Sequence, residues 1–551
     1  MKRPKWKIVG NRRPETLAEV LQLLLENRGV GPAFLNGSLK DLEPFLAIQG
    51  LTQGADLLAH HLSRGHKIVL VGDYDCDGIT SAAQLSLFLR DIGYLNYRVI
   101  IPDRPEGYGV PQRAILENPD ANLLVALDCG TQDVAAITLA RSRDMDCIVI
   151  DHHELPEHGL APANVLINPK QPCCPSSFKE FSSAGLTLLF LAALRRTLRT
   201  IAPQPSLGSK YLALAAIGTV ADIVPLIDAN RILTKAGLQH LGSEEFVPLK
   251  EMIALSGLAG KRLTSGHIGY YLGPRLNVAG RMASAQLAFD LLTGEDPEVI
   301  HRIAQELNRL NSRRQREEEA ALDVVRHRCA EIASANRTFV MGDPNWPSGI
   351  IGIIASRIQQ ELHYGPTVIF SIDEELGIAR GSARSIPGYD VHAALKRCEK
   401  HLIKWGGHRM AAGLTISADE IETFAASFEQ IAVEHPQELF TPQAKVDMEL
   451  DLALVSKDLL ETLKVLEPHG QGNPTPTFAA KKVTTKVQMV FGKDRNHLRL
   501  LLDDSVAGVF WRGHNLHCWE AGDCMDVVFQ VEWDNFLKKP ILNIKETGNL
   551  F

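Results

Sequence analysis

The stretch KIVLVGDYDCDGITSAAQLSLFLRDIG, residues 67–93, decides the fold. Its opening residues are apolar and rich in β-branched side chains, which is typical of a buried strand, and its second half has the spacing of a helix. Three later runs repeat the strand pattern and close on an acidic residue: YRVIIPD, NLLVALDCG and CIVIDHH. Helical stretches such as QDVAAITLARSRD separate them. This alternation predicts parallel βαβ units.

Acidic residues follow three of these runs directly. They are Asp73, Asp128 and Asp151. Functional groups of open α/β sheets gather at the carboxyl ends of the strands, so we expect these side chains to share one edge of the sheet.

The rest of the chain predicts further folding units, because 551 residues exceed what one hydrophobic core supports. Residues 298–335 lack Gly and Pro and predict one long helix, which either bridges two domains or belongs to a solvated bundle. Runs such as KKVTTKVQMVF and DVVFQVEW predict a small five-stranded barrel such as an OB-fold. We therefore expect a helical leader at 1–60, an acid-bearing α/β domain at 61–240, a helical connector at 241–336, a second α/β domain at 337–440 and the barrel at 441–551.

Composition describes an ordinary globular chain, with 45% hydrophobic and 22% charged residues. The formal charge of −7 disfavours a protein that coats duplex DNA, but it does not exclude one that threads a strand through a local basic groove. Nine cysteines without a CxxC pair predict free thiols and a cytoplasmic location. The most apolar long stretch, residues 211–227, contains Asp222 and is too short and polar to span a bilayer. Within it, Asp222 follows the apolar run AIGTVA, which we expect to be a strand, as LLVAL is before Asp128.

The segment DYDCDG has carboxylates at alternate positions, Asp73, Asp75 and Asp77. An EF-hand loop begins in the same way, but its twelfth position would be Gln84 instead of a bidentate Glu, and a strand-like run precedes it instead of a helix. Several carboxylates in one loop repel one another unless cations neutralise them. The imidazoles that follow Asp151 favour a first-row cation such as Mn²⁺. The sequence therefore predicts a metal site at this edge of the sheet.

Four segments in this order, DYDCDG, ALDCG, DHH and GTVAD, resemble the N-terminal motifs of the DHH phosphoesterase superfamily. GGHRMAAG resembles the hallmark of the DHHA1 domain that accompanies it, and the likeness to RecJ exonucleases extends over nearly the whole chain. LEPHGQGNPTPTF, residues 466–478, is similar to that family's entry into its OB-fold, although His469 stands where an aromatic such as Phe is more usual.

The resemblance implies a centre for two divalent cations, Mn²⁺ or Mg²⁺. Asp128 is expected to bridge them, and His153 is expected either to ligate or to contact phosphate. The implied metal ligands are Asp73, Asp75, Asp77, Asp128, His152 and Asp222, and the implied catalytic residues are Asp75, Asp77, Asp128, His152, His153 and Asp222.

Arginine, hydroxyl and glycine-rich segments predict where phosphate and bases bind. The guanidinium group of Arg can donate two parallel hydrogen bonds to a phosphate, and glycines let backbone N–H groups approach an anion. Bases stack on aromatic side chains. The predicted substrate-binding residues are Arg104, Tyr108, Arg275, Asn277, Arg281, Arg380, Ser382, Arg384, Gly406, Gly407 and His408. Of these, Arg380, Ser382 and Arg384 are expected in one short loop. In the barrel, Phe510, Trp511, Arg512, Lys493, Arg495 and Arg499 are available for a single strand, although some aromatics must form the barrel core.

The activity that the resemblance implies is that of a single-strand-specific 5′→3′ exonuclease, which releases 5′-mononucleotides in DNA repair and recombination. It also implies a monomer that works beside a single-strand binding protein and a RecQ-type helicase. One alternative is a DHH phosphodiesterase for short oligonucleotides, cyclic dinucleotides or pyrophosphate, which the extra β-rich module disfavours. Another is a non-catalytic replication scaffold, which the complete set of acids disfavours.

Overall fold

The computed structural model describes residues 4–10, 12–156, 159–200, 205–332, 336–493, 495–513 and 524–551. The chain forms two compact units, and their boundary falls inside one long helix. One unit comprises residues 32–312 and 466–475 and holds the predicted acid-bearing sheet. The other comprises residues 1–31, 313–465 and 476–551. The five predicted domains stay a prediction.

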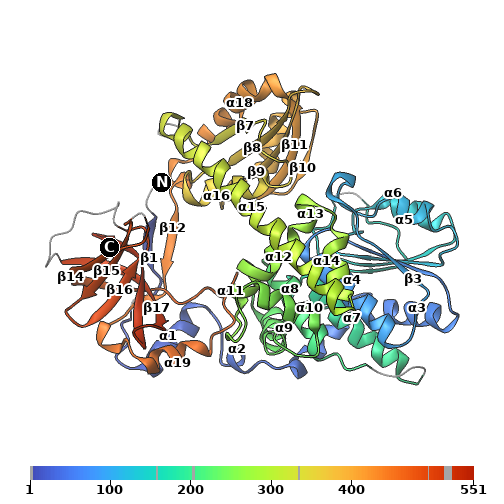
Figure 1. Ribbon diagram of the computed structural model, residues 1–551, viewed down its shortest axis with the longest axis horizontal. Coiled ribbons are helices and arrows are strands. Elements are labelled where there is room, and N and C mark those ends of the chain that lie inside the picture. Colours follow the sequence, from blue (N-terminus) through green and yellow to red (C-terminus); the bar gives the residue numbers. More distant parts are fainter. Residues whose placement is uncertain are drawn as a thin grey trace. The chain divides into compact units, whose positions relative to one another are not determined.

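The first unit is built on a five-stranded sheet in the order β3-β2-β4-β5-β6, in which every pair of neighbours is parallel (Figure 1). This confirms the predicted βαβ units. The chain runs from β2 outward to β3 and then returns to the other side of β2, so the strand order reverses between β2 and β4. In such sheets a crevice opens at the carboxyl ends of the strands that flank the reversal. The strands are β2 (Ile68–Gly72), β3 (Tyr97–Ile100), β4 (Leu123–Leu127), β5 (Asp146–Ile150) and β6 (Val165–Ile167).

Both faces of this sheet are buried, which explains why its strands are apolar without alternation. Along β2, Ile68 and Leu70 belong to one hydrophobic core, whereas Val69 and Val71 belong to another. Figure 1 shows α5 and α6 on one side of the sheet and α3, α4 and α7 on the other. The helices and turns of this unit are α2 (Ala33–Asn36), η1 (Leu39–Ala47), α3 (Leu51–Ser63), α4 (Cys76–Asp91), η2 (Arg104–Glu106), α5 (Arg113–Leu116), α6 (Val134–Arg141), α7 (Ser183–Thr197), η3 (Leu198–Thr200), α8 (Ser209–Ala221), α9 (Asp228–Leu238), α10 (Val247–Leu255), α11 (Ser265–His267), η4 (Ile268–Leu272), α12 (Gly273–Asn277), α13 (Ala279–Met282) and α14 (Gln286–Thr293).

The predicted long helix is α15 (Pro297–Ile332), 36 residues without an interruption. It leads into a second sheet in the order β10-β11-β9-β8-β7, in which β7 and β8 are parallel and the other pairs antiparallel. The elements around this sheet are β7 (Phe339–Asp343), α16 (Ile351–Glu361), β8 (Thr367–Asp373), β9 (Ile378–Arg384), α17 (Val391–Arg397), η5 (Glu399–His401), β10 (Lys404–Gly407), β11 (Ala411–Ser417), η6 (Ala418–Glu420), α18 (Ile421–Val433) and η7 (Gln437–Phe440).

The C-terminal strands close into the predicted five-stranded barrel, since the sheet order β14-β15-β16-β18-β17 is completed by pairing of β14 with β17. One feature of the N-terminus was not predicted. Residues 1–60 were expected to be helical, but they begin with β1, which pairs in parallel with β12. The elements are β1 (Lys5–Ile8), α1 (Leu17–Asn27), β12 (Gln443–Val446), β13 (Met448–Glu449), η8 (Leu452–Leu454), α19 (Lys457–Lys464), β14 (Phe478–Phe491), β15 (His497–Leu502), β16 (Val506–Phe510), β17 (Cys524–Asp534) and β18 (Lys539–Gly548).

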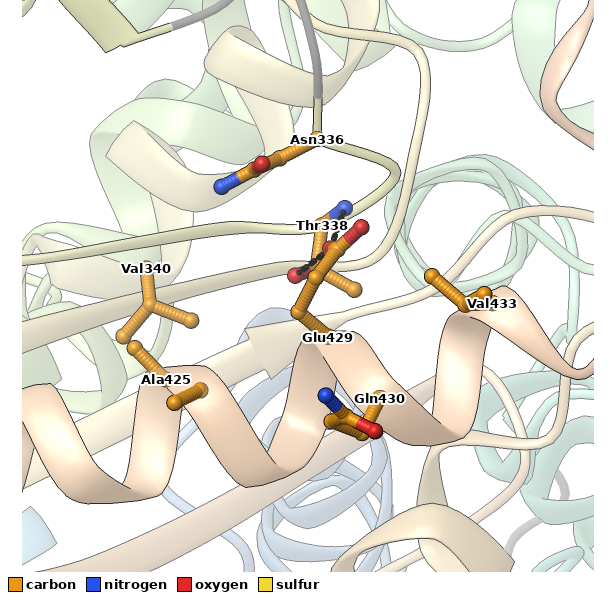
Figure 2. A pocket seen from close by; sticks show the side chains of 8 residues that line it. Asn336, Thr338, Val340, Ala425, Glu429, Gln430 and Val433 are labelled. Carbon is orange, nitrogen blue, oxygen red and sulfur yellow. Dashed lines mark hydrogen bonds between the residues drawn. The ribbon is translucent and has the colours of Figure 1, made fainter.

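A pocket of about 500 Å³ lies between β7 and α18, away from every predicted site residue (Figure 2). Its one carboxylate, Glu429, is engaged, because both the backbone N–H and the hydroxyl of Thr338 donate to it at 2.8 and 2.6 Å. The residue fastens α18 to the start of β7. The carboxylate in this pocket therefore has a structural role.

Seven of the cysteines are free thiols, as predicted, while Cys518 and the side chain of Cys329 lie outside the described residues. Within the described part of the chain, no helix combines the length and apolar character needed to cross a membrane.

Candidate active site

Asp73 and Asp128 continue the backbone ladder just beyond their strands. The N–H of Asp73 donates to Leu127 at 3.2 Å, and that of Asp128 donates to Ile150 at 2.9 Å. Gly72 pairs with Leu127, and Leu127 with Ile150, so the strands end in register. The register therefore places the acids in one row at the carboxyl edge, beside the strand-order reversal.

Asp75 and Asp77 are fixed by helix ends. Asp75 is the N-cap of α4, and its side chain accepts from the N–H groups of Asp77 and Gly78. A helix begins where an EF-hand would still be a loop, which excludes that alternative. The two oxygens of Asp77 accept from Ser183 at 2.7 Å and Ala184 at 2.9 Å, at the start of α7.

Asp222 was expected to follow a strand-like run, but it caps the C-terminus of helix α8. The run GTVA is largely buried, and periodicity alone does not distinguish such a helix from a buried strand. The helix nevertheless delivers Asp222 to the same place, with Oδ2 3.4 Å from Nε2 of His152.

His152 lies at the centre of the cluster. Its Nε2 is 3.4 Å from Oδ1 of Asp128 and 3.8 Å from Oδ2 of Asp77. Potential ligand atoms lie within 4.8 Å of one another in three groups: Asp128, His152 and His153; Asp77, His152 and Asp222; and Asp73, Asp75 and Asp128. Asp128 and His152 each belong to two of the three groups. Of these two side chains, the carboxylate of Asp128 has two oxygens and can join two cations, whereas an imidazole ligates through one nitrogen.

The donor atoms themselves suggest a cation. Oδ1 of Asp73, Oδ1 of Asp128 and Nε2 of His152 are buried, and among the described residues none has a hydrogen-bond partner. Buried polar atoms are almost always satisfied, and an unpaired buried charge is costly. Carboxylate and imidazole atoms that converge on one point fit a divalent first-row cation.

The pKa values of these acids are raised, as expected for buried carboxylates that lie close to one another. Burial first, and then the charge of Asp77, raises the pKa of Asp128, and burial followed by the charge of Asp75 raises that of Asp73. Burial and Asp75 raise the pKa of Asp77 to about 7, although backbone N–H groups oppose the shift. Burial and then Asp77 raise the pKa of Asp222. The pKa values of four acids are thus raised together, and bound cations would lower them.

The two histidines are differentiated by their surroundings. Burial and the neighbouring His153 lower the pKa of His152 to about 4, so its imidazole is neutral and competent to ligate. Burial also opposes the charged form of His153, but the hydrogen bond and charge of Asp151 outweigh it and raise the pKa to about 9. His153 is therefore a cation at neutral pH.

Asp151 organises this loop, a role that residue type alone did not reveal. Its Oδ1 accepts from the N–H groups of His152 and His153, and it lies 2.8 Å from Nδ1 of His153. Its Oδ2 accepts from Thr131 at 3.1 Å. Tyr108 completes the arrangement, with its hydroxyl 3.1 Å from the carbonyl of Asp128 and 2.9 Å from Nδ1 of His153.

The predicted phosphate ligands of this unit fall into two groups. Asn277 is used internally, because its Oδ1 accepts from the N–H of Cys76 at the first residue of α4. Arg275 contacts Asn308 and the carbonyl of Tyr271. Arg104 lies over the ring of Tyr74, 4.4 Å from its centre, and bonds the carbonyl of Gly280, next to Arg281 in the chain. Arg104 therefore lies beside the acidic loop, whereas Asn277 shapes it.

In the other unit, Arg380, Ser382 and Arg384 were predicted in a loop, but they lie on strand β9. The alternating small residues Ala379, Gly381 and Ala383 are buried, so period-two alternation places the three polar side chains together on the opposite face. A strand presents them more rigidly than a loop does. The prediction missed this because Gly and Ser usually mark turns.

The glycine-rich segment forms a hairpin beside them. Ser382 pairs with Gly413 on β11, which pairs with Gly406 on β10. His408 lies in the turn, and its N–H donates to Ala411. Gly407 has φ +143°, and a Cβ there would come within 2.5 Å of Ala412 Cα, so this close approach requires glycine. Arg384 is held by the hydroxyls of Ser356 and Ser382 at 3.2 and 2.9 Å.

On the barrel, three rings form one cluster. Trp511, which is 53% exposed, lies 5.7 Å from Phe491 and 5.0 Å from His497, measured between ring centres. Lys493, Arg495 and Arg512 near these rings are exposed. Phe510 is instead a core residue, and Arg499 lies 3.9 Å from Asp534. The barrel therefore offers an aromatic and basic surface in which Trp511 is the most accessible ring of the cluster.

Comparison with known proteins identifies the family. Residues 67–219 match the DHH family N-terminal domain, residues 335–434 the DHHA1 domain, and residues 446–546 the RecJ OB domain. The single-stranded-DNA-specific exonuclease RecJ of Dickeya dadantii is 33% identical over 520 residues, which cover 90% of this chain and 88% of that protein. The chain belongs to the RecJ family. RecJ of Bacillus subtilis is 31% identical over 543 residues, 95% of this chain and 67% of that protein.

Solved RecJ structures share the fold. RecJ from Thermus thermophilus in complex with Mn²⁺ matches with a TM-score of 0.83 and 26% identity, over 98% of this chain and 78% of that one. The same protein in complex with Mg²⁺ matches with a TM-score of 0.76 and 26% identity, over 98% and 77% of the two chains. Relatives of this fold thus bind the cations that the carboxylate and histidine cluster predicts.

Proposed function

We propose that this chain is a metal-dependent exonuclease that degrades single-stranded DNA from its 5′ end and releases 5′-mononucleotides. The observation that carries the proposal is the group of buried, unsatisfied ligand atoms around Asp128 and His152 at the carboxyl edge of the parallel sheet. Membership of the RecJ family supports the substrate and the reaction. The 5′→3′ direction is proposed because the resemblance to RecJ exonucleases implies it.

The proposed ligands are the six predicted ones. Asp128 would lie between the two cations, because it belongs to both the aspartate group and the histidine group. Two bound divalent cations, Mn²⁺ or Mg²⁺, activate a water, polarise the phosphorus centre and stabilise the leaving oxygen. Neutral His152 is ready to ligate without first losing a proton.

The chain's own residues arrange the substrate. His153 is cationic, and with Nδ1 occupied by Asp151 it has Nε2 to donate to a phosphate oxygen. The hydroxyl of Tyr108 lies 2.9 Å from the same Nδ1 and helps to orient the ring. Hydrolysis breaks the P–O3′ bond, joins a water oxygen to phosphorus and leaves a proton on O3′, so the released unit keeps its 5′-phosphate.

Strand binding is proposed for the other unit. Arg384 and Ser382, with the glycines of β10 and β11, would hold a phosphate group, and Trp511 with its neighbouring cations would hold bases further along the strand. A single-strand binding protein and a RecQ-type helicase as partners, a monomeric state and a cytoplasmic location remain predictions that rest on family resemblance.

The test is digestion of single strands and duplexes that carry a label at the 5′ or the 3′ end, with Mn²⁺, with Mg²⁺ or with EDTA. We expect labelled mononucleotide as the first product from 5′-labelled single strands, and a shrinking ladder from 3′-labelled ones. EDTA should stop both, and blunt duplexes should be poor substrates. A mononucleotide released first from the 3′ end would overturn the direction, and equal cleavage of duplexes would overturn the strand specificity.

A further inference from the structure

Ile223, the residue after the candidate ligand Asp222, has an unusual backbone and an unusual exposure. Its φ is +62°, in the left-handed region that β-branched residues rarely adopt. Its side chain is 70% exposed, although it directly follows the buried helix α8. Such strain is retained only where the surrounding structure over-determines it, and it concentrates at functional sites.

A glycine would satisfy this turn without strain, as it does at most left-handed helix ends. The turn itself needs only the N–H of Ile223, which donates to the carbonyl of Val220 at 3.2 Å. The exposed sec-butyl side chain contributes little to the core. The position therefore keeps an apolar group in solvent at a cost in folding stability, beside a cluster of ionisable ligands.

Further apolar surface lies on the element that packs against the end of α8. That element is η4, where the helix widens to a π turn, a feature often found at functional sites. A Cβ on Gly273 would lie 3.2 Å from the Cβ of Ala221, and one on Gly269 would lie 3.8 Å from Val220. On η4, Tyr270 is 81% exposed and Tyr271 is 42% exposed.

Tyr270 also borders a pocket of about 360 Å³ within the same unit. Residues of the segment 466–475 line the same pocket, and this segment is joined to the residues after Ile223 by the N–H of Leu226, which donates to Gln471 at 2.7 Å. The segment therefore borders Tyr270 and also contacts the chain that follows Ile223. Glu467, the acid in its lining, is paired with Arg262.

We propose that Ile223, together with Tyr270 on the element that packs against the end of α8, forms an apolar subsite for the base and sugar of the nucleotide next to the scissile phosphate. The occupant is the single strand itself, because Ile223 adjoins a residue whose carboxylate lies 3.4 Å from His152. The inference rests on the proposed function and adds a base contact to it. Phosphate ligands alone would hold the backbone and leave the adjacent base free to rotate.

The test removes the side chain and the base separately. Rates are measured at subsaturating substrate for wild type, Ile223→Gly and Ile223→Val, with oligothymidylate or the same strand carrying one abasic residue at the first, second or third position. Loss of a stacked base contact reduces affinity by about tenfold. We expect wild type to slow by about that factor at one abasic position. Ile223→Gly should be slow on the intact strand and show no further loss at that position, while Ile223→Val should resemble wild type.

A second readout separates a substrate contact from a structural role. Since glycine relieves the left-handed strain, Ile223→Gly should have a midpoint of thermal unfolding equal to or above that of wild type, together with a raised KM and a nearly unchanged kcat. A purely structural residue would lose both stability and kcat. Tyr270→Ala should reproduce the KM effect and Tyr270→Phe should not.

The matched control is Leu95→Ala, because Leu95 is 73% exposed in the same unit and precedes β3 at the opposite edge of the sheet. Leu95→Ala should change neither KM nor kcat. If the abasic penalty were the same in wild type and Ile223→Gly, the subsite would be refuted while the exonuclease remained intact. If wild type released no nucleotide from the intact strand, the proposed function would fail instead, so the two failures are distinguishable.

Discussion

Replacing Asp128 with asparagine should abolish cleavage and yet stabilise the metal-free protein. The side chain is 2% exposed, and its Oδ1 lies 3.4 Å from Nε2 of His152 with no hydrogen bond among the described residues. Asparagine has the same shape, tolerates the φ of +65° found here, and can donate an amide hydrogen to the neutral imidazole. The substitution therefore removes a charge without creating a cavity.

The magnitude follows from the cost of an unsatisfied buried acceptor, about 1–3 kcal/mol and more when the group is ionised. We expect the free energy of unfolding of Asp128→Asn in EDTA to exceed that of wild type by about 2 kcal/mol, which corresponds to a rise of about 3 °C in the unfolding midpoint of a unit of this size. Wild type should gain about 2.7 kcal/mol from a cation at 100 times its Kd, and the variant should not. The order of the two stabilities therefore reverses when Mn²⁺ is added.

The stability of the metal-free protein should also depend on pH. The pKa of Asp128 is raised in the folded protein by burial and then by Asp77, so the folded state binds the proton more tightly than the unfolded state. The stability associated with that proton is complete below the unfolded pKa of about 4 and is lost as pH rises through the folded pKa. Metal-free wild type should therefore lose stability from about pH 4 upward, and Asp128→Asn should lose less.

The assay is thermal unfolding in EDTA and in Mn²⁺ at several pH values, beside nuclease rates on a labelled strand. Glu43→Gln is a suitable control, because its carboxylate is 63% exposed and pairs with Arg196 at the surface. If Asp128→Asn were less stable than wild type in EDTA, the carboxylate of Asp128 would not be a destabilising buried acceptor. If the variant still gained stability from Mn²⁺, Asp128 would not be a required metal ligand.

Three further predictions concern single side chains. Tyr108→Phe should lower turnover by about ten- to a hundredfold with little change in metal affinity, because the hydroxyl orients His153; an unchanged turnover would remove Tyr108 from the site. Arg384→Ala should reduce the degradation rate of 5′-phosphorylated strands about ten- to a hundredfold more than that of 5′-hydroxyl strands at one salt concentration. Arg380→Ala, on the same face of β9, should reduce both rates alike. An equal loss of rate on both substrates for Arg384→Ala would make Arg384 a general contact to the DNA backbone. Trp511→Ala should weaken binding of long strands about tenfold and leave hydrolysis of a short oligonucleotide unchanged, and equal loss on both would indicate a folding role.

Surface substitution tests the barrel better than truncation does. Removing residues from about 445 onward would delete the segment 466–475, which packs within the unit that holds the acids. There Gln471 accepts from Leu226, and Asn473 donates to the carbonyls of Leu466 and Pro468. Truncation is therefore expected to lower activity on every substrate, whatever the barrel binds.

The acid-bearing edge was predictable because it depends on local pattern. β-branched runs that end on Asp73 and Asp128 specify parallel strands, and parallel strands that end in register bring these acids together. Two hydrogen-bond roles were not predictable: that of Asp151, and that of Asp77, whose carboxylate accepts from N–H groups at the start of α7. Both depend on backbone N–H groups that meet only in the folded chain. The sequence identifies a carboxylate, but it does not show which N–H groups will donate to it in the folded chain.

Two other differences have the same origin. The small residues that made β9 resemble a loop are required because a Cβ on Gly381 would meet the ring of Phe370 at 2.5 Å, a contact with a neighbouring strand. β1 was missed because a four-residue strand that pairs with residues 443–446 leaves almost no local pattern. Long-range pairing determines both segments, and single-sequence periodicity does not contain it.

Anomalous scattering from crystals equilibrated with Mn²⁺ would locate the bound cations directly. We expect two manganese peaks at the carboxyl edge of the parallel sheet, about 3.5–4 Å apart. The carboxylate of Asp128 should lie between them, with His152 bound to one. A single peak, or two peaks that Asp128 does not join, would contradict the two-cation centre on which the proposed reaction depends.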